Sequence, residues 1–196
     1  GLELHDPIGS AIAGNVLYTA DNGSRHVRSF DLSTGRPLDA VEIPGTGFIN
    51  GIAGDGSGTA YLSNTTTNTL YKITSDGAVS VFAEGTPLNS PNGVAMDNDG
   101  NIVIINIGDN AVITYDTNGR VIKEENAVEA GNDGVVVLPD GTKYVSSVRF
   151  GSVSKIDSSG AEIIASGIPS AASMCYDSIQ NQLVIPMNPN YSLAFI

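Results

Sequence analysis

The chain repeats one pattern about every 41 residues. Three copies are clear, namely "INGIAGDGSGTAYLSN" (49–64), "PNGVAMDNDGNIVIIN" (91–106) and "NDGVVVLPDGTKYVSS" (132–147). Each copy has Asn-Gly or Asp-Gly, a short apolar run, a turn that contains glycine, and a second run that ends in Asn or Ser. Weaker copies occupy residues 7–21 and 171–187. A repeat of this length is typical of proteins that stack one small structural unit several times.

Each copy continues with two further runs that are joined by another tight turn, as in "NTLYKITSDGAVSVFAEG" (68–85). Asp-Gly and Asn-Gly are strong hairpin signals, because glycine adopts the positive φ that such turns need. Each unit is therefore predicted to be a four-stranded antiparallel meander. The second runs, such as residues 102–105, are apolar without alternation, which is typical of strands covered on both faces.

Sheets stacked around a common axis cover each other's faces, so the pattern predicts an all-β fold, a β-propeller with five four-stranded antiparallel blades. A β-sandwich is the alternative, and the regular four-strand period disfavours it. We predict one propeller domain over residues 1–196. The last copy ends without a fourth strand, and residues 1–6 are available to complete it. The expected blades are residues 7–46, 47–88, 89–128, 129–169 and 170–196.

The composition excludes several partners. The net charge is −12, which argues against nucleic acid and anionic membranes because both attract basic surfaces. No apolar run approaches the ~18 residues that a membrane span needs. The one cysteine, Cys175, lies in an apolar stretch and is expected to be a small buried side chain. The chain begins at Gly1 without a methionine or a signal peptide, so we expect a processed form or a fragment.

Three segments carry a family resemblance: "FINGIAGDGSGTAYLSNT", "PNGVAMDNDGN" and "NDGVVVLPDGTKYVSS". They resemble the regucalcin/gluconolactonase-like β-propellers (the senescence marker protein family), which are built from NHL-like repeats, and the resemblance covers residues 7–196. The last stretch, "GIPSAASMCYDSIQNQLVIPM", looks like the end of bacterial, often exported members. The resemblance thus implies a periplasmic or secreted location.

The resemblance also implies a site. Family members are usually six-bladed and hold one divalent metal, often calcium, with a glutamate from the first blade, two asparagines and an aspartate. The aspartate is also the proposed base in lactone hydrolysis. Residue by residue, Asn50 and Asn92 match the two asparagines and Asp133 matches the aspartate. The glutamate has no counterpart, so the resemblance implies a chain without the family's first blade. At the equivalent positions of the other two repeats stand Ile8 and Ala172.

The residue types agree with that assignment. Residues that start the innermost strands of successive blades face the propeller axis, so Asn50, Asn92 and Asp133 are expected to converge. Amide and carboxylate oxygens suit Ca²⁺ or Mg²⁺, and a carboxylate can act as a general base. The alternative is that Asn-Gly and Asp-Gly only form turns. A charge in one repeat alone favours the ligand interpretation, since turn formation does not need it.

Further candidates are weaker. Asn106, Ser147 and Arg149 end second strands and are expected to line the mouth of the channel. The segments "DGSG" (55–58) and "DNDGN" (97–101) superficially resemble calcium loops, but their glycine is misplaced for an EF-hand. We predict that both are plain hairpin turns.

Two functions remain open, and a third possibility is a metal site that is only structural. The leading hypothesis is a metal-dependent, gluconolactonase-like hydrolase of lactones or small esters that uses Ca²⁺ and a small-molecule substrate. The alternative is a non-catalytic propeller that acts as a binding or assembly module for a protein partner. Ile8, Ala172 and the missing glutamate favour the alternative.

Overall fold

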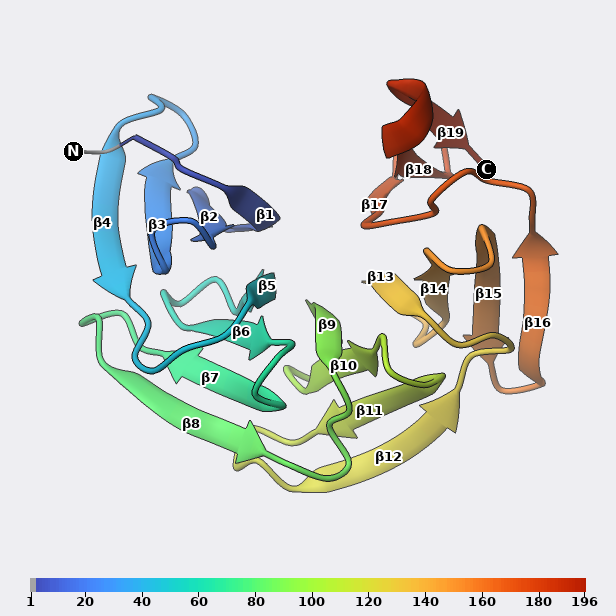
Figure 1. Cartoon of the computed structure of the whole chain (residues 1–196), viewed down its shortest axis with the longest axis horizontal. Coiled ribbons are helices and arrows are strands. Elements are labelled where there is room, and N and C mark those ends of the chain that lie inside the picture. The colour runs from blue at the N-terminus through green and yellow to red at the C-terminus, as the bar shows by residue number, and fades with distance from the viewer. Residues whose placement is uncertain (1–2) are drawn as a thin grey trace. The chain divides into compact units, whose positions relative to one another are not determined.

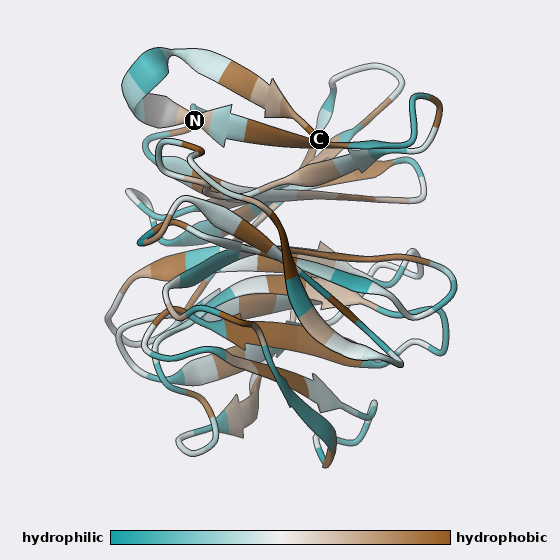
Figure 2. Cartoon of the chain, turned by 90° about the vertical axis from the view of Figure 1, so that its right-hand side faces the viewer, coloured by the Kyte–Doolittle hydropathy of each residue, from teal (hydrophilic) through white to brown (hydrophobic). Residues whose placement is uncertain are grey.

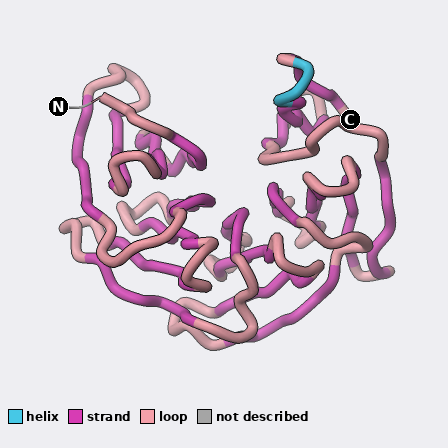
Figure 3. The backbone as a smooth tube through the Cα atoms, in the orientation of Figure 1, coloured by secondary structure: helices cyan, strands magenta, loops and turns pink. Residues whose placement is uncertain are grey.

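The computed structural model describes residues 3–196. The chain divides into two compact units, with the boundary between Met96 and Asp97, and each unit is described by itself. The fold is all-β, as the repeat predicts: the strands form antiparallel propeller blades, drawn with their labels in Figure 1. In the described part the sole helical segment is the short η1 (Asn188–Asn190), coloured cyan in Figure 3.

Each of the first four sheets contains four strands in consecutive chain order. The first is β1 (Pro7–Ala13), β2 (Val16–Asp21), β3 (His26–Asp31) and β4 (Pro37–Glu42). The second is β5 (Ile49–Gly54), β6 (Ala60–Asn64), β7 (Thr69–Ile73) and β8 (Val79–Glu84). The third is β9 (Pro91–Met96), β10 (Ile102–Asn106), β11 (Ala111–Tyr115) and β12 (Val121–Asn126). The fourth is β13 (Asn132–Val137), β14 (Lys143–Ser147), β15 (Ser152–Asp157) and β16 (Gly160–Ala165).

The fifth sheet has three strands in the described residues: β17 (Cys175–Asp177), β18 (Gln182–Met187) and β19 (Ser192–Phe195). Of the segment expected to complete it, residues 1 and 2 lie outside the described residues, and residues 3–6 are not in a strand. Instead, the backbone N–H groups of His5 and Asp6 donate to Asp21 Oδ1, at 3.0 and 2.9 Å. These hydrogen bonds tie the segment to the end of β2 in the first sheet.

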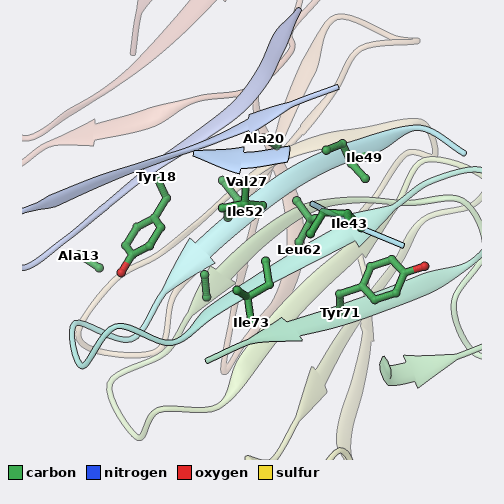
Figure 4. Packing of buried hydrophobic residues seen from close by; sticks show 11 residues of the cluster. Ala13, Tyr18, Ala20, Val27, Ile43, Ile49, Ile52, Leu62, Tyr71 and Ile73 are labelled. Atoms are coloured by element: carbon green, nitrogen blue, oxygen red, sulfur yellow. The ribbon is translucent and has the colours of Figure 1, made fainter. Parts of the chain in front are cut away.

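The core lies between facing sheets within each unit. In the first unit, Tyr18 and Val27 of the first sheet pack with Ile52, Leu62 and neighbouring side chains of the second sheet (Figure 4). In the second unit, a smaller cluster joins the fourth and fifth sheets. Its buried members are Val153, Ile168, Ala171, Leu183 and Ile185. Cys175 is exposed, so the prediction of a buried thiol is wrong. Its neighbours Met174 and Tyr176 pack against this cluster, and because successive side chains alternate along an extended chain, Cys175 faces the other way.

A bulge and a buried serine connect the innermost strands. Ile49 pairs with Asn64 and Ile52 with Leu62, so Asn50 and Gly51 together oppose the single residue Ser63. Ser63 Oγ accepts the Gly51 N–H at 2.9 Å and donates to the backbone carbonyl of Asn92 in β9 at 2.6 Å. One hydroxyl thus holds the bulge of its own sheet and the inner strand of the next sheet.

The second unit repeats this arrangement. Asp133 and Gly134 oppose the single residue Ser146. Ser146 Oγ accepts the Gly134 N–H at 2.8 Å and donates to the carbonyl of Ala172 at 2.7 Å. The contact gives Ala172 the role that Asn92 has in the first unit, in agreement with the alignment of the repeats. We refer to the bulge and its serine together as the serine clamp.

The glycine of each bulge is required by close packing. A Cβ on Gly51 would lie 2.2 Å from the Asn92 carbonyl oxygen, and one on Gly9 would lie 2.2 Å from that of Asn50. A Cβ on Gly134 would lie 2.8 Å from the Met174 nitrogen. Real Cβ atoms do not approach backbone so closely. The Asn-Gly and Asp-Gly pairs of 50–51 and 133–134 therefore lie inside strands, and the turn interpretation is wrong for them.

Replacement of Gly51 by alanine should disrupt this packing. We expect Gly51→Ala to lower the free energy of unfolding by about 3 kcal/mol or to prevent folding, because the added methyl group meets rigid backbone. The measurement is urea unfolding followed by circular dichroism. Gly35→Asn is the control: Gly35 has a φ of 69° and no other atom within 4 Å of the place that a Cβ would take, and Asn tolerates that backbone conformation. Equal stability of Gly51→Ala and the wild type would contradict the proposed packing.

Candidate functional site

The predicted site residues occupy one repeated position. Asn50, Asn92 and Asp133 are each the second residue of an innermost strand, and Ile8 holds the same place in β1. Asn50 and Asp133 belong to the bulges described above. Bulges re-aim side chains and are frequent beside active sites. The first unit contains both amides, and the second unit contains Asp133 and Ala172.

In the first unit, a threonine orients the Asn50 amide. Asn50 Nδ2 donates to Thr65 Oγ1 at 3.3 Å, and Thr65 Oγ1 donates to the Pro91 carbonyl at 2.8 Å. The nitrogen of the half-buried amide is thus engaged, and within the described residues its Oδ1 accepts no hydrogen bond from the protein. Asn92, on the adjacent inner strand, is 3% exposed. The structure therefore brings Asn50 and Asn92 onto neighbouring strands of one unit.

In the second unit, Asp133 is half-buried and has a hydroxyl partner. Asp133 Oδ1 accepts a long hydrogen bond from Ser173 Oγ at 3.4 Å. Ser173 follows Ala172, the residue that the repeat alignment places at the equivalent position. Sequence reasoning missed Ser173 because the alignment stopped at an alanine that has no donor or acceptor side chain.

The polar side chains at the repeated position are two amides, Asn50 and Asn92, and one carboxylate, Asp133. In residues 3–196 no three His, Cys, Asp or Glu side chains gather as they do in a cluster of metal ligands. Ile8, at the first repeat's equivalent position, is 39% exposed and has no ligating atom. At the repeated position the side chains with oxygen atoms are Asn50 and Asn92 in the first unit and Asp133 in the second unit.

Comparison with family models decides where the chain belongs. The model of the SMP-30/Gluconolactonase/LRE-like region matches residues 4–129. The chain belongs to the SMP-30/gluconolactonase/LRE-like family. No curated protein matches the chain in sequence.

Solved structures similar to this family member are propeller proteins of varied function. Virginiamycin B lyase from Staphylococcus aureus aligns with a TM-score of 0.77 and 12% identity over 99% of this chain and 70% of that one. A streptogramin B lyase aligns with a TM-score of 0.74 and 14% identity over 97% and 68%. A chain of the nidogen/laminin complex aligns with a TM-score of 0.83 and 16% identity over 97% and 75%. At these identities the similarity establishes the fold alone. No helix in the described residues is long and apolar enough to cross a membrane.

Asn106 and Ser147, which end the second strands of the third and fourth sheets, are buried, and Ser147 holds the chain on both sides of its sheet's first two strands. Ser147 Oγ donates to the Ala130 carbonyl at 2.6 Å and accepts the Phe150 N–H at 3.2 Å. Asn106 is 0% exposed, and Arg149 lies on the surface. The expectation that Asn106 and Ser147 line a channel mouth is therefore wrong, because their side chains are buried.

In the first two sheets the residue that ends the second strand also holds neighbouring loops by side-chain hydrogen bonds. Asn64 Nδ2 donates to the Thr46 carbonyl at 3.0 Å, and Asn64 Oδ1 accepts the Thr67 N–H. Asp21 accepts hydrogen bonds from Ser24 and pairs with Arg28 at 2.9 Å. Burial raises the pKa of Asp21, but these hydrogen bonds outweigh burial and hold the pKa below its ordinary value. In each of these sheets the residue that ends the second strand holds the segment before the innermost strand and the loop after the second strand.

Asn132, beside Asp133, is a polar residue in an apolar place. Its side chain is 0% exposed, and neither Oδ1 nor Nδ2 has a hydrogen-bond partner within the described residues. The first residue of the inner strand is Ile49 in the second sheet and Pro91 in the third, and both are buried. Buried polar atoms without partners are rare and call for an explanation. The signal in the sequence is the polar residue at a repeat position that is otherwise apolar.

We expect Asn132→Val to raise the free energy of unfolding by about 1 kcal/mol or more, because it removes two buried polar atoms that lack partners. Urea unfolding at neutral pH measures the change. The control is Asn126→Val, at an exposed position of β12, which should change stability by at most about 0.5 kcal/mol. A loss of stability in Asn132→Val would show that an ordered water satisfies the amide.

The turns between strands use aspartates as caps, including the two segments that resemble calcium loops. Asp55 Oδ1 accepts the N–H groups of Ser57 and Thr59, and Asp97 Oδ1 accepts those of Asp99 and Asn101. Both segments are hairpin turns, between β5 and β6 and between β9 and β10, as the sequence predicts. Asp31 caps another turn by accepting hydrogen bonds from Ser33 and Thr34.

Hydrogen bonds from Ser33, and then from Thr34, lower the pKa of Asp31 from its ordinary 3.8 to about 2. A lowered pKa means that the folded state binds the proton less tightly than the unfolded state. The stability contribution is thus complete above about pH 5 and is lost as the pH falls through about 4 towards 2. Other turn aspartates, such as Asp76 and Asp116, have pKa values shifted in the same direction.

We therefore expect the urea midpoint to stay level from pH 7 to about 5 and to fall steeply between about pH 4 and 2. Circular dichroism at each pH measures the midpoint. In Asp31→Asn the fall should be shallower, because one of the titrating caps is gone. A midpoint that does not change down to pH 2 would contradict this role of the aspartates.

Proposed function

We propose that this family member is a metal-dependent hydrolase of lactones or related small esters. The observation that carries the proposal is the repeated inner-strand position, which has an amide in Asn50, an amide in Asn92 and a carboxylate in Asp133. The surrounding serine clamp and glycine are the same in both units, so the fold does not require these side chains. Family membership supports the substrate class.

The donor atoms fit a hard cation such as Ca²⁺. Calcium takes amide and carboxylate oxygens and completes its shell with water. The engaged Nδ2 of Asn50 leaves its oxygen for a ligand, since Thr65 holds the nitrogen. Asn50, Asn92 and Asp133 are the residues that would hold the ion. When bound, the ion would polarise the carbonyl of the substrate.

The chain's own groups supply the proton chemistry. In lactone hydrolysis a water adds to the carbonyl carbon, and the ring C–O bond breaks to leave a hydroxy acid. Asp133 would take a proton from the attacking water and return it to the leaving ring oxygen. The Ser173 hydroxyl, which donates to Asp133 Oδ1, would hold that carboxylate in place. Such proton transfer contributes about 10²–10⁴-fold to a rate.

A second candidate function is a non-catalytic binding or assembly module with a protein partner. Ile8 and Ala172 support it, because two of the five equivalent positions cannot ligate a metal. The same fold occurs in a chain of the nidogen/laminin complex, which aligns with a TM-score of 0.83. Propellers host many functions on one frame, so the test must separate binding from chemistry.

Calcium titration by calorimetry, followed by lactone turnover with and without a chelator, tests the proposal. We expect about one calcium per chain. Lactone hydrolysis should stop when the chelator removes the metal. Asp133→Asn should lose calcium binding and lower kcat/KM by about 10²-fold or more, since it removes a charged ligand and the base.

Asp140→Asn is the matched control, because it removes the same charge from an exposed turn of the same sheet. This variant should bind calcium and turn over lactone like the wild type. Calcium binding without turnover would reject the hydrolase and leave a structural metal. The absence of both in the wild type would favour the binding module.

A further inference from the structure

Arg149 is a basic residue without an acidic partner. In the second unit, residues 97–196, acidic residues outnumber basic ones by 12 to 5. The other four basic side chains form ion pairs: Arg120 with Asp116, Lys123 and Lys143 with Glu125, and Lys155 with Asp157. The exposed side chain of Arg149 has no ion pair or hydrogen bond with any residue that the structure describes. Because carboxylates are so abundant in this unit, an unpaired guanidinium calls for an explanation.

The Arg149 side chain lies over the backbone of Gly131. A Cβ on Gly131 would lie 2.6 Å from Arg149 Cβ and 3.5 Å from Arg149 Nε. The Val148 N–H also donates to the Gly131 carbonyl at 3.0 Å. The side chain of Arg149 therefore folds back along the connection that leads from β12 into β13.

This position puts Arg149 at the same end of the fourth sheet as Asp133. Asn132 pairs with Ser147, so the start of β13 lies beside the end of β14. Gly131 precedes Asp133 by two residues, and Arg149 follows Ser147 by two residues. The carboxylate of the candidate site and the unpaired guanidinium are thus carried by adjacent segments at one end of one sheet.

The turn that carries Arg149 has a fixed geometry. Hydrophilic residues, teal in Figure 2, lie largely in turns, and Arg149 lies in the turn between β14 and β15. Ser147 Oγ accepts the Phe150 N–H at 3.2 Å, and the Ser147 carbonyl accepts the Gly151 N–H at 2.8 Å. A Cβ on Gly151 would lie 2.4 Å from the Ile168 carbonyl oxygen, so the turn also packs closely against the next connection. A group held in place in this way binds a ligand at a lower entropic cost.

The acidic residue of the neighbouring connection is engaged elsewhere. Glu129 lies between β12 and β13 and is half-buried. Its Oε2 accepts a hydrogen bond from Ser152 Oγ of β15, and it forms no ion pair with Arg149. The positive charge of Arg149 is therefore available to a ligand.

An arginine in these surroundings suits an organic carboxylate. The planar guanidinium matches the two oxygens of a carboxylate, and such charged, paired hydrogen bonds are strong and directional. The net charge of −12 repels anions, so an anionic ligand needs a local positive group where it binds. Phe150, which is 54% exposed on the same turn, adds an apolar surface beside the charge. A carboxylate on a carbon skeleton fits both groups.

We propose that Arg149 selects the substrate of this family member by binding a carboxylate that the lactone carries in addition to its ring ester. The inference rests on the proposed hydrolase function, in which Asp133 acts at the ring carbonyl. Arg149 would then hold a group of the substrate away from the reacting bond. The preferred substrates would be lactones of dicarboxylic acids, and neutral lactones would be poor substrates.

Two lactones that differ in one group test the proposal. The five-membered lactone of glucaric acid has a carboxylate where that of gluconic acid has a hydroxymethyl group. We expect the wild type at neutral pH to have a kcat/KM at least about 10-fold higher for the acidic lactone, because a hydrogen bond between charged groups adds to its binding. Arg149→Met removes the charge and keeps an unbranched side chain, and it should abolish this preference.

Arg120→Met is the matched control, because it removes the same charge from an exposed turn of the same unit. It should keep the preference of the wild type. Loss of the preference in both variants would assign it to the overall charge and would overturn the proposal. A wild type that turns over both lactones equally well would also overturn it and would leave the hydrolase standing.

Calorimetric titration with the two hydrolysis products, at one fixed concentration of free calcium, needs no turnover. We expect glucarate to bind at least about 10-fold more tightly than gluconate, with the difference lost in Arg149→Met and kept in Arg120→Met. That result in a chain that hydrolyses neither lactone would support the Arg149 site and reject the hydrolase. Equal or absent binding of the two acids in such a chain would overturn both.

Discussion

The hydrogen bond from a buried serine to the backbone of the next inner strand is the contact on which the site depends. Ser63 and Ser146 each accept an N–H from their own bulge and donate to a carbonyl one sheet further on. The bulge, the missing side chain of the glycine and the hydroxyl work together. Without the glycine the strands could not approach, and without the bulge the hydroxyl would not face both partners. This arrangement sets the position of the preceding residue, which is Asn50 or Asp133.

The repeat made the fold predictable because three independent features of the sequence recur with the same period. Turn glycines, apolar second strands and a constant period all agree on four-stranded blades, and the fold is of that kind. Agreement of local and global signals is what makes a sequence specify a fold. The interpretation of Asn50-Gly51 as a turn was wrong for a physical reason. The same dipeptide serves in tight turns and in strands that meet another backbone, and only the distance from Gly51 to the Asn92 carbonyl distinguishes them.

The sequence predicted where the candidate site residues lie in their strands better than it predicted which residues surround them. Alignment of the repeats placed Asn50, Asn92 and Asp133 at the second residue of their strands, which is where they lie. The alignment could not find Ser173, because that contact with Asp133 depends on the course of the chain before β17. The burial of Asn106 and Ser147 was equally hidden, since a polar residue at a strand end looks the same whether it faces solvent or fastens a loop.

Within each bulge, the glycine and the serine have structural roles, and the residue before the glycine has a variable side chain. The same fold can therefore have different chemistry at that residue. The glycine is fixed by contact with backbone, and the serine is fixed by its two hydrogen bonds. The residue before the glycine contributes its backbone to the clamp, and its side chain is free to vary: Asn50 in one unit and Asp133 in the other leave the clamp unchanged. Isoleucine and alanine occur at the same position in other repeats. A position that is rigid in its backbone and unconstrained in its side chain is where a ligand site can be gained or lost at little cost to folding. Three of the five positions have an amide or a carboxylate and the other two have an apolar residue. The fold tolerates either kind of side chain there, so the polar residues are not required for folding.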